Sequence, residues 1–198
     1  MTERLEVISG SMFSGKTREL KMLVERQEIA GVKAQVFKPT VDNRWGKIGK
    51  VRSHSGEEKD AIPVKDSAEL LSRVDADTKY IAIDEAQFFD AGIVSVIDKL
   101  LDRGVKVLVA GLPLDFRGEP FGTMPILLAK ADNTIKVTAI CTEILENGEI
   151  CGEEATRTQR FVYGQPANYN DPIVQIGAAE SYAARCPTHH KVPRRPGK

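Results

Sequence analysis

The segment that most constrains the fold of this chain is Gly10–Thr17, which reads GSMFSGKT. It matches G-x-x-x-x-G-K-[ST] and lies between a predicted strand, Arg4–Ser9, and a predicted helix, Lys16–Ala30. In that context the glycines let successive backbone N–H groups turn towards a phosphate, and the helix N-terminus adds the positive end of its dipole. Lys16 then reaches the β- and γ-phosphates, and Thr17 offers its hydroxyl to magnesium. The expected phosphate-binding residues are Gly10, Ser11, Met12, Phe13, Ser14, Gly15, Lys16 and Thr17. A glycine-containing surface turn with a solvated lysine is the alternative.

Short apolar strands alternate with helical patterns through the first two thirds of the chain. Near-continuous apolar strands separated by helices are typical of a parallel sheet that is covered on both faces. The predicted fold class is therefore α/β, with a P-loop NTPase-type parallel sheet flanked by helices. After the first strand and helix, we expect strands at 34–37, 80–84, 105–110 and 135–140, and helices at 67–74, with Ser67 as N-cap, and 92–103.

Composition excludes several classes of protein. The charges of the 28 basic and 28 acidic side chains cancel, which argues against broad electrostatic capture of nucleic acid. No apolar run approaches the roughly 18 residues of a membrane span, and the start MTERLEVIS lacks the features of a signal peptide. Three cysteines do not build a disulfide scaffold but suit a reducing compartment, where clustered thiols more often bind metal. We expect a cytoplasmic enzyme or small-ligand binder with no nucleic-acid or membrane partner.

The character of the sequence changes near residue 140. Helical periodicity ends there, and all three cysteines and two of the three histidines follow. The predicted division is an α/β nucleotide-binding domain at 1–139, a small second domain at 140–192 and a flexible tail at 193–198.

Two adjacent carboxylates, Asp84 and Glu85, follow the apolar run YIAI. The carboxyl end of such a strand lies at the ligand-binding edge of a parallel sheet, beside the phosphate loop. Asp84 would help to hold magnesium, and Glu85 could accept a proton from a hydroxyl acceptor. Alternatively, Glu85 only caps the next turn or solvates the sheet edge.

Several motifs, taken together, resemble the type II thymidine kinases, a family that includes the cytosolic animal enzyme and most bacterial ones. These motifs occur in family order from residue 10 to residue 189. They are GSMFSGKT (10–17), DEAQFF (84–89), GLPLDFRGEPF (111–121), TRTQR (156–160), IGAAESY (176–182) and CPTH (186–189).

The resemblance implies a role for each matching residue. Glu85 matches the catalytic base that acts on the deoxyribose 5′-hydroxyl, and Phe116 matches the aromatic that stacks on thymine. Arg44, in Asp42-Asn43-Arg44, is a candidate for neutralising phosphate charge, although a solvated loop residue is the alternative. Gln87 and Asp84 are assigned to ATP and phosphate binding. Met12, Phe88 and Leu112 match the nucleoside pocket, and Thr158, Ile173, Gly177 and Tyr182 match the lasso loop that closes over the base.

A zinc site is expected in the second domain. Cys186 and His189 have a C-x-x-H spacing, which allows two ligands to reach one metal from a tight turn. The other two ligands would be Cys141 and Cys151, with His190 as the alternative to His189. We expect a structural Cys₃His site; unpaired buried thiols without a metal are the alternative.

The spacing of the first cysteine pair departs from the family, because nine residues, TEILENGEI, replace the usual two. Asn147-Gly148 predicts a two-residue hairpin turn. Such a turn places Cys151 opposite Ile144, so that Cys141 lies three residues further along, about 10 Å on a straight strand. A bend or bulge is needed before both thiols reach one metal.

The sequence therefore predicts a thymidine kinase that transfers the γ-phosphoryl of ATP to thymidine, with Mg²⁺ and a structural Zn²⁺. The resemblance also implies a homotetramer and feedback inhibition by the triphosphate end product. Two other hypotheses stay open at this point: a kinase for a different nucleoside, and a zinc-ribbon nucleic-acid module driven by a P-loop ATPase.

Overall fold

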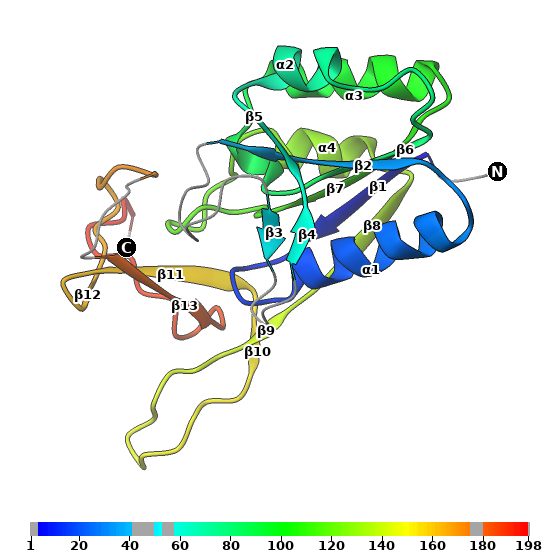
Figure 1. Cartoon of the computed structure of the whole chain (residues 1–198). Coiled ribbons are helices and arrows are strands. Elements are labelled where there is room, and N and C mark those ends of the chain that lie inside the picture. The colour runs from blue at the N-terminus through cyan, green and yellow to red at the C-terminus, as the bar shows by residue number, and fades with distance from the viewer. Residues whose placement is uncertain (1–3, 41–49, 53–57, 175–179, 198) are drawn as a thin grey trace.

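A six-stranded parallel sheet forms the centre of the molecule (Figure 1). The computed structural model describes residues 4–40, 50–52, 58–174 and 180–197. The strand order is β5-β2-β6-β7-β1-β8, which places β1 between β7 and β8. The strands are β1 (Leu5–Ser9), β2 (Ala34–Pro39), β5 (Ile62–Val64), β6 (Tyr80–Ile83), β7 (Lys106–Gly111) and β8 (Asn133–Lys136).

Helices cover both faces of this sheet. The helices are α1 (Lys16–Ile29), α2 (Ser67–Ser72), α3 (Gly92–Asp102) and α4 (Met124–Lys130). Because side chains alternate along a strand, Val7 and Ile8 belong to opposite faces. Val7 packs in the core that α2, α3 and α4 cover, whereas Ile8 packs in the core that α1 covers. The predicted α/β class, a parallel sheet flanked by helices, is confirmed.

The structure corrects one helix start and adds a helix. The N-cap of α2 is Asp66, not Ser67: the Asp66 carboxylate accepts the backbone N–H of Glu69 at 2.8 Å. The hydroxyl of Ser67 instead donates to Asp90 Oδ1 at 2.7 Å. Helix α4 was not predicted, because only seven residues, MPILLAK, carry its pattern.

The predicted strand at 135–140 is two strands. The N–H of Val137 makes the last bond to β1, donating to Ser9 O at 2.9 Å. Beyond Ser9 the chain enters the glycine-rich loop, so no strand remains there for parallel pairing. Residues Ala139–Ile140 form β9 and pair antiparallel with β10 (Glu154–Ala155).

The remaining strands lie outside the central sheet. A three-stranded antiparallel sheet has the order β12-β11-β13 and lies beside the loop that follows β1 (Figure 1). Its strands are β11 (Arg157–Val162), β12 (Gln165–Pro166) and β13 (Glu180–Arg185). Strands β3 (Lys50–Arg52) and β4 (Glu58–Asp60) pair with each other. The division into domains at residue 140 stays a prediction. Among the described residues, no helix has the length and apolar character that crossing a membrane requires.

Candidate functional site

The loop between β1 and α1 has the geometry of a phosphate cradle. Lys16 is buried, and its Nζ donates to the carbonyl of Ser11 at 2.8 Å, so the side chain folds back across the loop. Gly15 has a left-handed φ of 87° and forms the N-cap of α1. A Cβ on Gly10 would lie 2.2 Å from the carbonyl oxygen of Val137, so only glycine fits there.

The loop is tied to the three-stranded sheet and the segment before it. The N–H of Met12 donates to Thr158 Oγ1 at 3.0 Å, and Ser11 Oγ donates to the carbonyl of Ala155 at 2.9 Å. Thr158 lies on β11 and is buried. A residue expected at the nucleoside therefore contacts the loop expected at the phosphates.

The two residues predicted to hold magnesium lie side by side. Thr17, at the start of α1, donates to Asp84 Oδ2 at 3.1 Å. Asp84 follows β6 and is buried. Burial and the neighbouring charge of Glu85 raise the pKa of Asp84 to about 7, against the lowering effect of Lys16. This carboxyl therefore occupies a place where a nearby cation would strongly favour its ionised form.

Glu85 has an unusual backbone conformation, with a φ of 52° in the left-handed region. Non-glycine residues pay about 1 kcal/mol or more for this conformation, and such strain concentrates at functional sites. The Glu85 carboxylate accepts a hydrogen bond from the side-chain amide of Gln87. Gln87 is buried and also accepts the backbone N–H of Leu112 at 2.9 Å. The contacts of Gln87 orient Glu85, and the expected role of Gln87 in ATP binding stays a prediction.

The residues expected to line the nucleoside pocket come from several elements. Leu112, Phe116 and Thr158 are buried, Met12, Phe88 and Tyr182 are partly exposed, and Ile173 is exposed. Phe88 ends the short 3₁₀ helix η1 (Ala86–Phe88) and contacts the ring of Phe121 edge-on, with centroids 5.5 Å apart. The predicted residues Arg44 and Gly177 lie outside the described residues.

Arg160 was not singled out from the sequence. Its side chain is fully buried, and its guanidinium carbon lies 3.8 Å from the centroid of the Phe116 ring. Only its position within TRTQR could have drawn attention to it, since an arginine on a polar strand gives no sign of burial.

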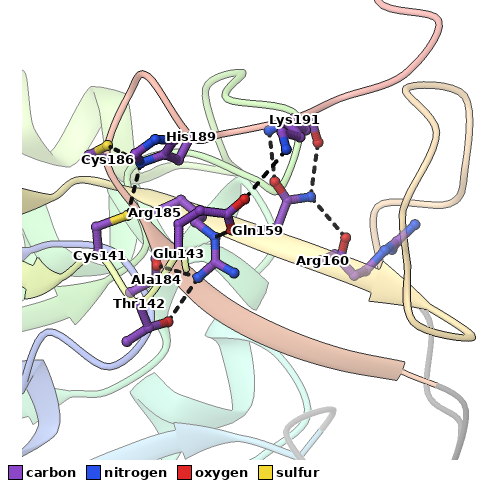
Figure 2. Close-up of polar contacts among 10 residues, drawn as sticks. All are labelled: Cys141, Thr142, Glu143, Gln159, Arg160, Ala184, Arg185, Cys186, His189 and Lys191. Atoms are coloured by element: carbon purple, nitrogen blue, oxygen red, sulfur yellow. Dashed lines mark hydrogen bonds and ion pairs between the residues drawn. The ribbon is translucent and has the colours of Figure 1, made fainter. Parts of the chain in front are cut away.

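Four residues form a cluster with the donor set of a zinc site. They are Cys141, Cys151, Cys186 and His189, whose ligand atoms lie within 4.8 Å of one another. Zn–S and Zn–N bonds of about 2.3 and 2.0 Å in a tetrahedron require S···N separations of about 3.5 Å. His189 Nδ1 lies 3.7 Å from the Cys141 sulfur and 3.3 Å from the Cys186 sulfur. Figure 2 draws both contacts as dashed lines. The cluster therefore fits the metal.

A bulge brings Cys141 and Cys151 together. The N–H of Cys141 donates to Glu153 O, and the carbonyl of Cys141 accepts from Gly152 N–H. Gly152 and Glu153 therefore both lie opposite Cys141. Gly152 has a φ of 73°, the pattern of a G1 bulge. The predicted need for a bend or bulge is confirmed.

The predicted hairpin register is wrong by one residue. Ile144 pairs with Ile150, not with Cys151. The reason is a three-residue turn: Gly148 N–H donates to Leu145 O, and Leu145 N–H donates to Glu149 O. Gly148, with a φ of 82°, is the extra residue in the turn.

The two histidines have different neighbours. His189 faces the sulfurs, whereas His190 Nε2 lies 2.8 Å from the carbonyl oxygen of Phe116. Burial lowers the pKa of His190, which favours the neutral ring with its Nε2 proton donated to that carbonyl. Burial acts to raise the pKa of Cys141, but backbone N–H donors and His189 outweigh it and lower the pKa to about 7. A thiol that ionises so readily suits a metal ligand.

Comparison with known proteins gives two findings. A family model described as thymidine kinase matches residues 3–190 of this chain. Among solved structures, the chain is similar to the genome packaging NTPase B204 from Sulfolobus turreted icosahedral virus 2, in complex with ATP-gammaS. That match has 16% identity and a TM-score of 0.43, and it covers 75% of this chain and 79% of the other. The fold assignment therefore depends on the sheet topology and the helices described above.

Proposed function

Since the chain belongs to the thymidine kinase family, and is thus a nucleoside kinase that uses ATP with a divalent metal, we propose that it phosphorylates the 5′-hydroxyl of thymidine. The products are thymidine monophosphate and ADP. The observation that carries the proposal is the placement of Glu85 directly beside the Thr17–Asp84 pair, with its carboxylate held by Gln87. A carboxylate beside the two residues proposed to hold magnesium supports a base that acts next to the γ-phosphate.

The proposed transfer needs no covalent intermediate on the protein. The 5′-oxygen of the nucleoside attacks the γ-phosphorus, while the bond to the bridging oxygen of ADP breaks. The hydroxyl proton passes to Glu85, whose main contribution in a loose transition state is to orient the acceptor. Lys16 offsets charge on the phosphates, and Thr17 with Asp84 would hold a magnesium ion that neutralises the rest.

The base would be held on the other side of the site. Phe116 is proposed to stack on thymine, with Met12, Phe88 and Leu112 as the pocket. Thr158, Ile173, Gly177 and Tyr182 are proposed to form the closing loop. A pocket whose polar groups are satisfied by one base only rejects bases that leave them unpaired.

The Cys₃His cluster is proposed to hold a structural zinc ion. Four protein ligands leave no open position for a reacting water, so the metal would hold β9, the hairpin and the Cys186–His189 turn together. A cytoplasmic location, a homotetramer and the absence of a nucleic-acid partner are also proposed.

The test is a phosphoryl-transfer assay with Mg·ATP and a panel of thymidine, deoxyuridine, deoxycytidine and purine nucleosides. We expect the highest kcat/KM for thymidine. A Glu85→Gln variant should bind ATP and thymidine normally but lose about 10²- to 10⁴-fold in kcat. A clear preference for another nucleoside would contradict the proposed substrate. ATP hydrolysis stimulated by single-stranded DNA, without nucleoside phosphorylation, would support the nucleic-acid alternative instead.

A further inference from the structure

Arg160 is the largest of the fully buried side chains among the described residues, and it lies against Phe116. Its guanidinium carbon is 3.8 Å from the ring centroid, which is close contact for a cation over an aromatic face. Arg160 projects from β11, whereas Phe116 follows β7 in the loop at 112–121. The contact therefore joins the three-stranded sheet to a loop of the central sheet.

The guanidinium of Arg160 also contacts a third segment, residues 171–173. Its Nη1 donates to the carbonyl oxygens of Pro172 and Ile173, the second at 3.4 Å. Its Nη2 lies 3.9 Å from Asp171 Oδ2, and that carboxylate oxygen accepts the N–H of Asn168 at 2.9 Å. Ile173 lies in the segment proposed to close over the base.

A second contact holds the backbone of Phe116. His190 Nε2 donates to its carbonyl oxygen at 2.8 Å. The next residue, Lys191, is fixed by Gln159, which accepts the Lys191 N–H at 2.8 Å and donates to its carbonyl at 2.9 Å (Figure 2). Gln159 and Arg160 are neighbours on β11, so the ring and the carbonyl of Phe116 are held from one region.

We infer that Arg160 and His190 are positioning residues that set the geometry of the nucleoside pocket by holding Phe116 at its ring and at its carbonyl. The inference rests on the proposed function, in which Phe116 meets the base. Neither side chain is expected to touch the reacting atoms. Their loss should therefore weaken nucleoside binding and leave ATP binding intact.

The chemistry of arginine supports this role over simple core packing. Burying a guanidinium is costly even when it is paired with a carboxylate, and apolar side chains of similar volume are often at least as stable. A guanidinium, however, can lie flat on a ring while its N–H groups donate to carbonyls at its edge. Lysine has no planar group, so it cannot make both contacts.

The main test compares Arg160→Lys with wild-type protein in steady-state kinetics. The thymidine KM should rise about 10- to 100-fold, which is the range expected for losing hydrogen bonds from a charged donor. The ATP KM should stay within about twofold and kcat within about threefold, because the phosphate loop and Glu85 are unchanged.

Arg185→Lys is the matched control. Arg185 is also a buried arginine near an aromatic ring, 5.8 Å from the Phe161 centroid, but it pairs with Glu143 rather than with the pocket. Its thymidine KM should not change. Urea unfolding of both variants shows whether each is folded under assay conditions.

A second pair of variants tests the carbonyl contact without changing the buried arginine. His190→Leu removes the donor and should raise the thymidine KM, whereas His190→Gln retains an N–H donor and should restore it at least in part. An unchanged thymidine KM in folded Arg160→Lys, or an equal rise in both KM values, overturns the inference. If Arg160→Lys does not fold, an unchanged KM in His190→Leu overturns it. Wild-type protein that does not phosphorylate thymidine overturns the proposed function as well.

Discussion

Replacing Glu85 should separate stability from activity, because its backbone has the left-handed φ of 52°. Glycine adopts this conformation without the Cβ clash, which costs other residues about 1–2 kcal/mol. Glycine also loses about 0.5–1 kcal/mol more conformational entropy than alanine on folding. The Glu85→Gly variant should therefore be more stable than Glu85→Ala by about 0.5–1 kcal/mol, the reverse of the order in a helix.

The comparison uses two variants that both lack the carboxylate. Each loses the contact with Gln87, so the difference between them reports the backbone conformation alone. For a chain of 198 residues, that difference corresponds to a melting temperature about 2 °C higher for the glycine variant. Urea unfolding at equal protein concentration, without nucleotide, gives the free energies directly.

Both variants should also lose most of the phosphoryl transfer, since neither has a base at this position. If Glu85→Ala is as stable as Glu85→Gly or more so, the argument that strain is stored at Glu85 is wrong. If either variant keeps near-normal kcat, the proposed catalytic role of Glu85 is wrong, whatever the stabilities.

Three further predictions concern the contacts around the site. Thr158→Val should lower the free energy of unfolding by about 1–2 kcal/mol in urea, because the Met12 N–H loses its acceptor, whereas Thr158→Ser should keep most of it. Because the pKa of Asp84 is raised to about 7, the folded apoprotein keeps a proton between about pH 4 and pH 7 that the unfolded chain has released. The free energy of unfolding should therefore have a component that falls as pH rises across that window, and pH-dependent urea titrations of Asp84→Asn should lack it. Elemental analysis should find one zinc ion per chain, and Cys151→Ala should lower this content; chelation should lower the free energy of unfolding, and an unchanged unfolding curve would speak against a structural metal.

Local patterns predicted the elements near the phosphate loop well. The sequence GSMFSGKT lies between β1 and α1 as expected, and YIAI is the buried strand that leads to Asp84. These elements are predictable because each depends on residues close in sequence. Helix α4 was missed because it is short, and its buried face is defined by packing on the sheet rather than by a long periodic pattern.

The hairpin at 139–155 shows where local reasoning fails. Asn147-Gly148 marked the turn correctly, but a single extra residue in the turn shifted the whole register. The sequence indicated that a bend or bulge was needed, but it did not indicate that the bulge would lie at Gly152. Turn length and bulge position depend on how both strands pair over their full length.

The sequence by itself determined the α/β class, the phosphate loop, the carboxylate pair and the candidate zinc ligands, which are three cysteines and either of two histidines, because spacing and periodicity encode local chemistry. Only the tertiary structure decided that His189 joins the cluster while His190 holds Phe116. It also decided that Arg160 lies buried under the Phe116 ring, although the two residues are far apart in sequence. Such contacts depend on how separate sheets pack, and burial of a charged side chain follows from that packing rather than from its neighbours along the chain.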